Sequence, residues 1–232
     1  TWPWFPGGNR SDFITLYIVA GFGRLRHLGV STDLRLVVAA LPRVDAWITE
    51  MYKEIVHGGK ETECHLTPTV ALYLYARSFF LKDVAIAAAN RGASDYFLGQ
   101  AKHYWQKVGR QSQAHLALAL QRWGDTDTPA AIIKSVREFA TVNEELGMFW
   151  RDTEAFWSWG HAPIETQALM IEALLEVAGD SAAAEACKVW LLKQKQTQDW
   201  KTTKATADAV YALLLRGEKL LGSDVRVEVA LA

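Results

Sequence analysis

Phe156-Trp157-Ser158-Trp159-Gly160 is an aromatic turn that leads into an amphipathic segment over 163–177, and this arrangement occurs three times in the chain. The other two turns are Trp2-Pro3-Trp4-Phe5-Pro6-Gly7-Gly8, before 12–28, and Gln198-Asp199-Trp200-Lys201-Thr202-Thr203, before 204–215. Each following segment carries a threonine in its first turns: Thr15, Thr166 and Thr206. A unit repeated in this way is typical of a helical array and not of a one-off bundle.

The tryptophans of these turns allow two interpretations. Of the ten tryptophans in the chain, five lie in the turns: Trp2, Trp4, Trp157, Trp159 and Trp200. They form either a stacking platform for a sugar or an isoprenoid, or plugs at the ends of helical hairpins whose indole N–H groups bond to loop carbonyls. Their recurrence at equivalent turns favours the plugs.

Proline and capping residues predict where further helices begin. Thr67-Pro68 and Thr128-Pro129 each read as an N-cap followed by a first helical residue, opening helices over 68–81 and 129–141. Pro42 is expected to break or kink a helix over 33–56, since proline removes a helical hydrogen bond. Ala162-Pro163 is a weaker start signal. Further helices are predicted over 95–108, 111–123, 182–195 and 204–216.

These helices are of two kinds. The run 70–76 is apolar nearly all round and is expected to be buried on both sides, whereas Lys134, Arg137 and Glu138 mark one polar face of the helix around 132–139. An alternation of inner and outer helices favours an all-α fold, an α/α toroid in which helical hairpins circle a centre. A plain solenoid of stacked hairpins is the alternative.

The ends of the sequence suggest a piece of a longer protein. We expect the toroid to occupy 1–222 and to be incomplete at its N-terminus. The stretch 225–231 alternates apolar and polar residues, so 223–232 is predicted to hold the first β-strand of a following β-domain.

Composition excludes several classes of function. The chain has 232 residues and a net charge of −1, with scattered Lys and Arg, so no nucleic-acid partner is predicted. It has no run of eighteen apolar residues and no signal peptide, so no membrane span is expected. The two cysteines, Cys64 and Cys187, lack the spacing of metal ligands and pair only if the fold brings them close.

Four carboxylates are candidates for hydrolytic chemistry. They are Asp12 near the first aromatic turn and Asp152, Glu154 and Glu165 near the second. Glycoside hydrolases need two carboxylates about 5 to 10 Å apart. None of the four forms a diagnostic pair in the sequence, and acids at helix starts are expected from the helix dipole.

Histidine and cysteine give weaker signals. Cys64-His65 precedes a helix start, where a thiol pKa is often lowered, but no base accompanies it. His161 and Glu165 lie four residues apart, a spacing more typical of a hydrogen bond at a helix start than of a metal site. No dinucleotide, P-loop, nucleophile-elbow or zinc-protease motif occurs, and no Asp-rich diphosphate-binding run is present. We therefore assign no catalytic, cofactor-binding or metal-binding residue.

Three segments together resemble a known family. Ile164-Glu165-Thr166-Gln167-Ala168-Leu169, Val189-Trp190-Leu191-Leu192-Lys193-Gln194-Lys195 and the stretch 200–209 resemble, in this order, the thioester-domain region of the α2-macroglobulin family. The opening 2–8 with 12–18 is similar to the bacterial branch. The resemblance covers residues 1 to about 222.

This resemblance implies an α/α toroid of the terpenoid-cyclase and prenyltransferase type. It also implies a periplasmic or secreted protein, with a lipoprotein anchor outside this sequence as one option. Members of the family trap proteases: cleavage of a bait segment exposes a Cys–Gln thioester, which acylates the protease. The implied partners are proteases, with no enzymatic activity in this segment.

The hallmark Cys-x-Glu-Gln motif of the family is absent from this sequence. Cys64 is followed by His65-Leu66-Thr67, and Cys187 by Lys188-Val189-Trp190. The motif either precedes Thr1 or has been lost in a bacterial subgroup. Complement relatives also use a histidine in the first aromatic-turn region, and no histidine precedes His27 here. The alternatives are a toroid enzyme acting on a carbohydrate or an isoprenoid, and an interaction domain that docks a cell-wall synthesis enzyme.

Overall fold

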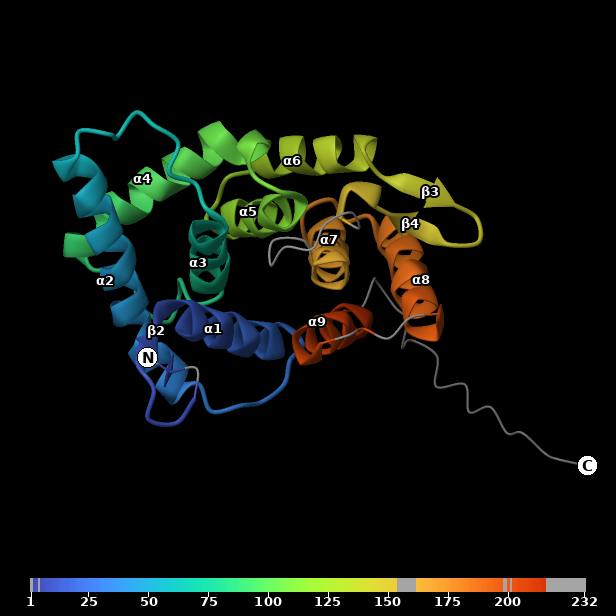
Figure 1. Cartoon of the computed structure of the whole chain (residues 1–232), viewed down its shortest axis with the longest axis horizontal. Helices are drawn as coiled ribbons and strands as arrows, with labels where there is room; N and C mark the ends of the chain where they lie inside the picture. Colours follow the sequence, from blue (N-terminus) through green and yellow to red (C-terminus); the bar gives the residue numbers. More distant parts are fainter. Residues whose placement is uncertain (1, 4, 154–161, 198–199, 201, 216–232) are drawn as a thin grey trace, which may run out of the picture.

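The chain is predominantly helical (Figure 1). The structure, a computed structural model, describes residues 2–3, 5–153, 162–197, 200 and 202–215. Within these residues there are nine α-helices: α1 (Asp12–His27), α2 (Arg35–His57), α3 (Pro68–Ser78), α4 (Ala88–Tyr104), α5 (Arg110–Arg122), α6 (Asp127–Glu138), α7 (Pro163–Glu176), α8 (Ser181–Thr197) and α9 (Thr203–Leu214). The predicted all-α class is confirmed.

Short elements connect some of these helices. Two antiparallel pairs of strands join β1 (Trp2–Pro3) to β2 (Arg10–Ser11) and β3 (Thr141–Asn143) to β4 (Gly147–Phe149). Two 3₁₀ turns, η1 (Trp105–Lys107) and η2 (Arg151–Thr153), follow α4 and β4.

The odd-numbered helices form the centre of the molecule. They pack on one another in chain order, α1 on α3, α3 on α5, α5 on α7 and α7 on α9. The even-numbered helices lie outside them: α2 packs on α1 and α4, α6 on α5, and α8 on α7 (Figure 1). The molecule therefore has an inner and an outer layer of helices, and we call α1, α3, α5, α7 and α9 the inner helices.

Burial follows this division. Residues 70–78 of α3, 112–120 of α5 and 165–174 of α7 are buried without interruption. By contrast, the outer helix α6 buries only one face, formed by Pro129, Ile132, Ile133 and Val136. This is the pattern that the sequence predicts for 70–76 and 132–139, because a helix covered on all sides needs apolar residues all round.

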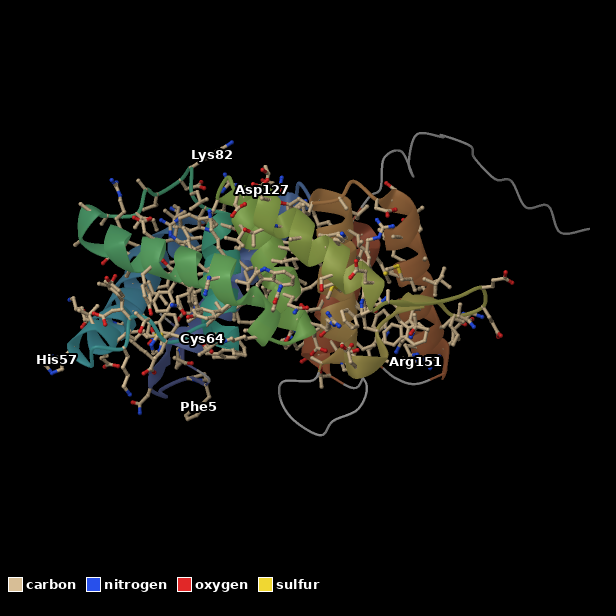
Figure 2. The ribbon with its side chains drawn as sticks, turned by 90° about the horizontal axis from the view of Figure 1, so that it is seen from above. Phe5, His57, Cys64, Lys82, Asp127 and Arg151 are labelled. Atoms are coloured by element: carbon tan, nitrogen blue, oxygen red, sulfur yellow. The ribbon has the colours of Figure 1, made fainter. Side chains whose placement is uncertain are left out.

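The inner helices all point the same way. Phe5, Cys64 and Arg151 precede α1, α3 and α7, and Figure 2 shows them along one side of the molecule. Lys82 and Asp127 follow α3 and α5 and lie on the opposite side (Figure 2). The positive ends of the inner-helix dipoles therefore face one side of the molecule.

Hydroxyl side chains start three of the inner helices. Ser11 accepts from the backbone N–H of Ile14, Thr67 from that of Val70, and Thr202 from that of Ala205, at 3.3, 3.3 and 3.0 Å. These are N-caps, which satisfy N–H groups that have no partner within the helix. The predicted start at Thr67-Pro68 is confirmed.

The predicted start at Thr128-Pro129 is wrong by two residues. Helix α6 begins at Asp127, and the carboxylate of Asp125 accepts from the backbone N–H groups of Asp127 and Thr128 at 3.0 and 3.1 Å. Asp125, two residues before the first residue of α6, thus bonds the N–H groups that Thr128 was expected to precede as the N-cap. The helix also ends at Glu138, three residues short of the predicted 141.

Of the break or kink predicted at Pro42, the break does not occur. Helix α2 runs without interruption from Arg35 to His57. Pro42 itself is exposed, while its neighbours Leu41 and Val44 are buried in the core. Because Pro42 lies on the exposed face, its ring leaves the core packing of Leu41 and Val44 intact, and this packing holds the helix together.

The hairpin of β3 and β4 was not predicted. Asn143 Oδ1 accepts from the backbone N–H groups of Glu145 and Leu146, both at 2.8 Å, and Gly147 has a φ of 78°. Asparagine and glycine at such positions are typical of turns.

Helix α4 begins at Ala88, seven residues before the predicted 95, because the residues around Gly92 are helical and not a break.

Two expectations concern the ends of the chain and the membrane. The strand predicted within 223–232 lies outside the described residues. Among the helices that are described, no helix is both long enough and apolar enough to cross a membrane.

Two glycines of α1 provide a test of the inner-helix packing. A methyl group at Gly23 would clash with the ring of Phe79, directly after α3, whereas one at Gly21 meets nothing within 4 Å. We expect Gly23→Ala to lower the free energy of unfolding by about 1–3 kcal/mol, because the helices must move apart. Gly21→Ala should raise it by roughly 0.5–1 kcal/mol, because alanine favours the helix. Urea unfolding followed by circular dichroism measures both. Equal effects of the two substitutions would contradict the close approach of α1 to Phe79.

Candidate functional site

The five inner helices share a chain of buried polar side chains, which we call the axial network. Arg24 of α1 pairs with Asp208 of α9, and its Nε donates to the hydroxyl of Tyr75 of α3 at 2.9 Å. The Tyr75 hydroxyl donates to Glu172 of α7 at 2.7 Å, and Arg122 of α5 donates to the same carboxylate at 2.6 Å. Each inner helix therefore contributes one residue to this connected set.

The axial network extends at both ends. At the C-terminal ends of the inner helices, Arg122 Nε also donates to Glu176 at 2.7 Å. At the N-terminal ends, Lys204 Nζ lies 3.1 Å from Asp208 and 3.4 Å from Glu165. Three cations thus face four carboxylates, so the charges nearly balance.

The surroundings of Glu172 and Arg24 favour their charged forms despite their burial. Burial alone would raise the pKa of Glu172, but Arg122, Arg24 and the Tyr75 hydroxyl outweigh it, and the pKa lies below its usual 4.5. Burial alone would lower the pKa of Arg24. Tyr75, Asp208 and Glu172 outweigh this effect, so the pKa of Arg24 lies well above its usual range. Buried charges that are paired and hydrogen-bonded in this way stay charged at neutral pH.

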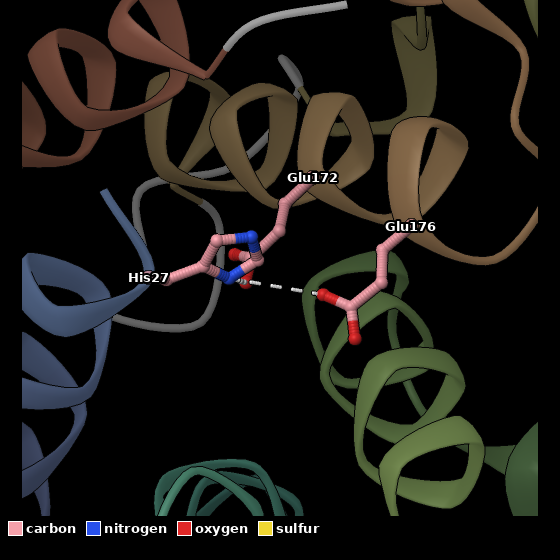
Figure 3. Close-up of side chains that lie close together, drawn as sticks. All are labelled: His27, Glu172 and Glu176. Carbon is pink, nitrogen blue, oxygen red and sulfur yellow. Dashed lines mark ion pairs between the residues drawn. The ribbon is translucent and has the colours of Figure 1, made fainter. Parts of the chain in front are cut away.

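His27, Glu172 and Glu176 form a cluster at the C-terminal ends of α1 and α7 (Figure 3). Their ligand-type atoms lie within 4.8 Å of one another, and His27 Nδ1 is 3.9 Å from each carboxylate. Both carboxylates, however, already accept hydrogen bonds from Arg122. A metal ion would have to displace a bonded guanidinium, so we assign no metal site here.

A large cavity lies at the N-terminal ends of the inner helices. Its volume is about 1010 Å³, and the first turns of all five inner helices line it. Aromatic rings of Tyr17, Trp190 and Trp200 form part of its wall. Its polar lining includes Arg24, His115, Glu165, Lys204 and Asp208. A cavity of this size, mostly apolar with a few polar groups, is typical of ligand sites.

His115 of α5 is neutral in this setting. It is buried against Tyr75, with ring centroids 4.8 Å apart. Burial lowers its pKa well below the usual 6.5, and the nearby cations Arg24, Lys204 and Arg122 lower it further. A neutral imidazole offers one hydrogen-bond donor and one acceptor to the cavity.

The carboxylates predicted as catalytic candidates do not come together. Asp12 lies 3.5 Å from Arg43, Asp152 lies 2.9 Å from Arg110, and Glu165 pairs with Lys204. Of these three acids, only Glu165 lines the large cavity, while Asp152 lines a separate cavity of about 390 Å³. Glu154 lies outside the described residues. Among the described acids, the hydrolase-type pair considered from the sequence is therefore not formed.

The cysteines do not pair. Cys64 is exposed in the loop before α3 (Figure 2), and Cys187 is buried in α8, where burial raises the pKa of its thiol. Both are free thiols. His65, beside Cys64, bonds through its ring to the Lys60 carbonyl at 2.8 Å. His161 lies outside the described residues.

The described turn tryptophans agree with the plug interpretation only in part. Trp200 is buried, and its indole N–H donates to the Leu191 carbonyl at 3.2 Å. It also lines the cavity, so it plugs a hairpin end and presents an aromatic surface at once. Trp2 is half-buried and packs against the core. Trp4, Trp157 and Trp159 lie outside the described residues.

The axial network was missed at the sequence level, although a signal was present. Glu172 is the one charged residue in the otherwise apolar run 168–175 of α7, whereas Arg24 is followed closely by Arg26 and His27 in α1. A single charge in a helix that is otherwise apolar predicts a buried partner, because an unpaired buried charge is very costly. The sequence does not show which charge on another helix is that partner.

Comparison with known proteins gave no family model that matches the chain and no curated protein that matches it. The site is therefore interpreted from its own residues. Its carboxylates are paired with Arg24, Arg122 and Lys204, so no acid of the network among the described residues is without a cationic partner. The arrangement suits the binding and shielding of groups better than proton transfer.

Two buried tyrosines, Tyr75 and Tyr211, provide a test of the axial network, because only the Tyr75 hydroxyl forms hydrogen bonds within it. The Tyr75 hydroxyl bonds to Arg24 and Glu172, whereas that of Tyr211 is buried with no hydrogen-bond partner among the described residues. We expect Tyr75→Phe to cost about 1–3 kcal/mol of unfolding free energy, because it leaves charged groups short of a partner. Tyr211→Phe should be neutral or stabilising. Denaturant melts of both variants decide this, and a Tyr211→Phe loss as large as that of Tyr75→Phe would contradict the assignment.

Proposed function

We propose that this chain is an α/α-toroid domain of a bacterial α2-macroglobulin-like protein that traps proteases in the periplasm or outside the cell. The proposal rests on the family-like segments around 164–169, 189–195 and 200–209. One observation supports it most: these segments, which are separate in the sequence, contact one another. Lys204 pairs with Glu165 at 3.4 Å, and Trp200 donates to the Leu191 carbonyl at 3.2 Å.

The opening segment that resembles the bacterial branch belongs to the same unit. Lys204 Nζ lies 5.7 Å from the centre of the Tyr17 ring, so this lysine of α9 lies close to the N-terminal halves of both α1 and α7. Gln167, within the first family-like segment, donates to the Cys187 carbonyl next to the second segment at 3.2 Å. The family-like segments therefore pack against one another within one folded unit, as the proposal requires.

The order of helix packing supports the toroid. The inner helices follow one another in chain order, each with an outer helix behind it, and the first meets the last through Arg24 and Asp208. A linear stack of hairpins would keep its first and last helices apart. The contact between α1 and α9 therefore favours hairpins arranged around a centre.

In this proposal the domain has no catalytic residue of its own. Its role is to provide a rigid, water-excluding surface within a protein whose rearrangement captures the protease. Where a Cys–Gln thioester is present, residues outside this chain supply it. The proposed partners are proteases.

The test treats the full-length protein with a broad-specificity protease. We expect cleavage to make the protein more compact in gel filtration, and the bound protease to lose activity on large protein substrates. Activity on a small peptide substrate should fall much less, because a trapped protease remains open to small molecules.

Two controls sharpen this experiment. The same protease inactivated at its active site should cause no compaction, because the bait segment stays uncut. The proposal would be contradicted if the cleaved protein eluted unchanged in gel filtration and the protease kept full activity on large protein substrates.

The cavity supports a second candidate, an enzyme that acts on a carbohydrate or an isoprenoid. Its aromatic wall and its carboxylates, Glu165 and Asp208, are of the right chemical kind. Both acids are bonded to Lys204, however, and Asp208 also to Arg24, so neither resembles a free catalytic acid. Turnover of a polysaccharide or a prenyl diphosphate that is lost in Glu165→Gln would favour this candidate. An interaction domain that docks a cell-wall synthesis enzyme has no specific contact in its favour.

A further inference from the structure

Two polar side chains of α5 face the large cavity without a hydrogen bond. Ser112 is 5% exposed and His115 is 8% exposed, and both line the cavity. Among the described residues, neither the Ser112 hydroxyl nor the His115 ring makes a hydrogen bond to another side chain or to the backbone. Among the described residues, the Tyr211 hydroxyl is the side-chain polar atom that is fully buried without a partner, so the polar atoms of Ser112 and His115 are accessible from the cavity. Water or a ligand in the cavity can therefore bond to them.

The start of α5 adds further donors at the same place. Its N-cap is Gly109, no side chain caps the helix, and its first turn contains no acid. Gly109, Gln111 and Ser112 all line the cavity. The N–H groups of a first helical turn have no partner within the helix and bind anions readily.

The charges around the cavity also favour an anion. Arg24 and Lys204 are balanced by Asp208 and Glu165. The start of α5, with neither a side-chain cap nor an acid in its first turn, keeps an uncompensated positive helix end at this cavity. One added negative charge therefore complements the site, and one added positive charge does not.

The rest of the cavity wall suits an apolar body. Leu72, Leu169, Trp190 and Trp200 line it, from α3, α7, α8 and the turn before α9. A volume of about 1010 Å³ is at the upper end of the range for small-molecule sites, so there is room for an extended or bulky group.

We propose that this cavity binds a small amphiphilic carboxylate, with its carboxylate on Ser112, His115 and the first N–H groups of α5 and its apolar body against the tryptophans. Ser112 and His115 act as donors, with His115 in the tautomer that directs its N–H to the ligand. The inference does not depend on the protease-trap proposal, since it concerns a cavity within this chain alone.

Binding should be linked to pH. The groups that face His115 are Arg24 of α1, Tyr75 of α3, Glu165 of α7 and Lys204 and Asp208 of α9, with Arg122 further along α5. In the empty site, burial and the cations hold the pKa of His115 well below 6.5. A bound carboxylate opposes this and raises that pKa, so binding takes up protons. Affinity should therefore rise as the pH falls through the pKa that His115 has in the complex, as long as the ligand carboxylate stays ionised.

The experiment is calorimetric titration of the 232-residue chain with three probes of the same length: decanoate, decanol and decylammonium. We expect decanoate to bind at least tenfold more tightly than either of the others at pH 7. Ser112→Ala and His115→Phe should each weaken decanoate binding about tenfold to a hundredfold, the usual loss for one hydrogen bond to a charged group. They should change decanol binding little.

His103→Ala serves as the matched control, because His103 is exposed on the outer helix α4 and should leave all three affinities unchanged. Circular dichroism checks that each variant is folded, and Ser112→Ala alone carries the test if His115→Phe is not. The proposal is overturned if no probe binds, if decanol or decylammonium binds as tightly as decanoate, or if Ser112→Ala leaves decanoate affinity unchanged.

Discussion

The pairing of Arg24 with Asp208 is the constraint on which the rest of the structure depends. The two residues are 184 positions apart in the sequence, on the first and last inner helices, and both are buried. A buried charge without its partner costs several kcal/mol, so α1 and α9 cannot both reach their buried positions separately. The hydrogen bonds from Arg24 through Tyr75 and Glu172 to Arg122 extend this requirement to α3, α7 and α5.

This network also explains why the two ends of the helical centre differ. At the C-terminal ends, Arg122, Glu172 and Glu176 fill the space and satisfy one another. At the N-terminal ends, the helix starts leave a cavity of about 1010 Å³ with donors that have no internal partner. The paired charges at the C-terminal ends of the inner helices stabilise the fold, whereas the N-terminal ends leave a cavity that is accessible to other molecules.

The sequence allowed prediction of features that depend on neighbouring residues. The start of α3 follows from Thr67-Pro68, and the full burial of 70–76 follows from its composition. The break expected at Pro42 is absent because the effect of a proline depends on which face of α2 is exposed, a property of the packed structure. The partners of Arg24 and Glu172 and the cavity facing Ser112 and His115 come from residues on different helices, so no local pattern reveals them.

The central claim, that Arg24 and Asp208 hold the first and last inner helices together, is tested most directly by a double-mutant cycle. Arg24→Met, Asp208→Asn and the double variant are compared by urea unfolding, with the exposed pair Arg26 and Asp83, 2.7 Å apart, as control. Each single substitution should cost about 3–5 kcal/mol, and the double should cost less than the sum by about 2 kcal/mol or more. The control pair should show a coupling of about 0–1 kcal/mol. Additive losses at Arg24 and Asp208 would contradict the account.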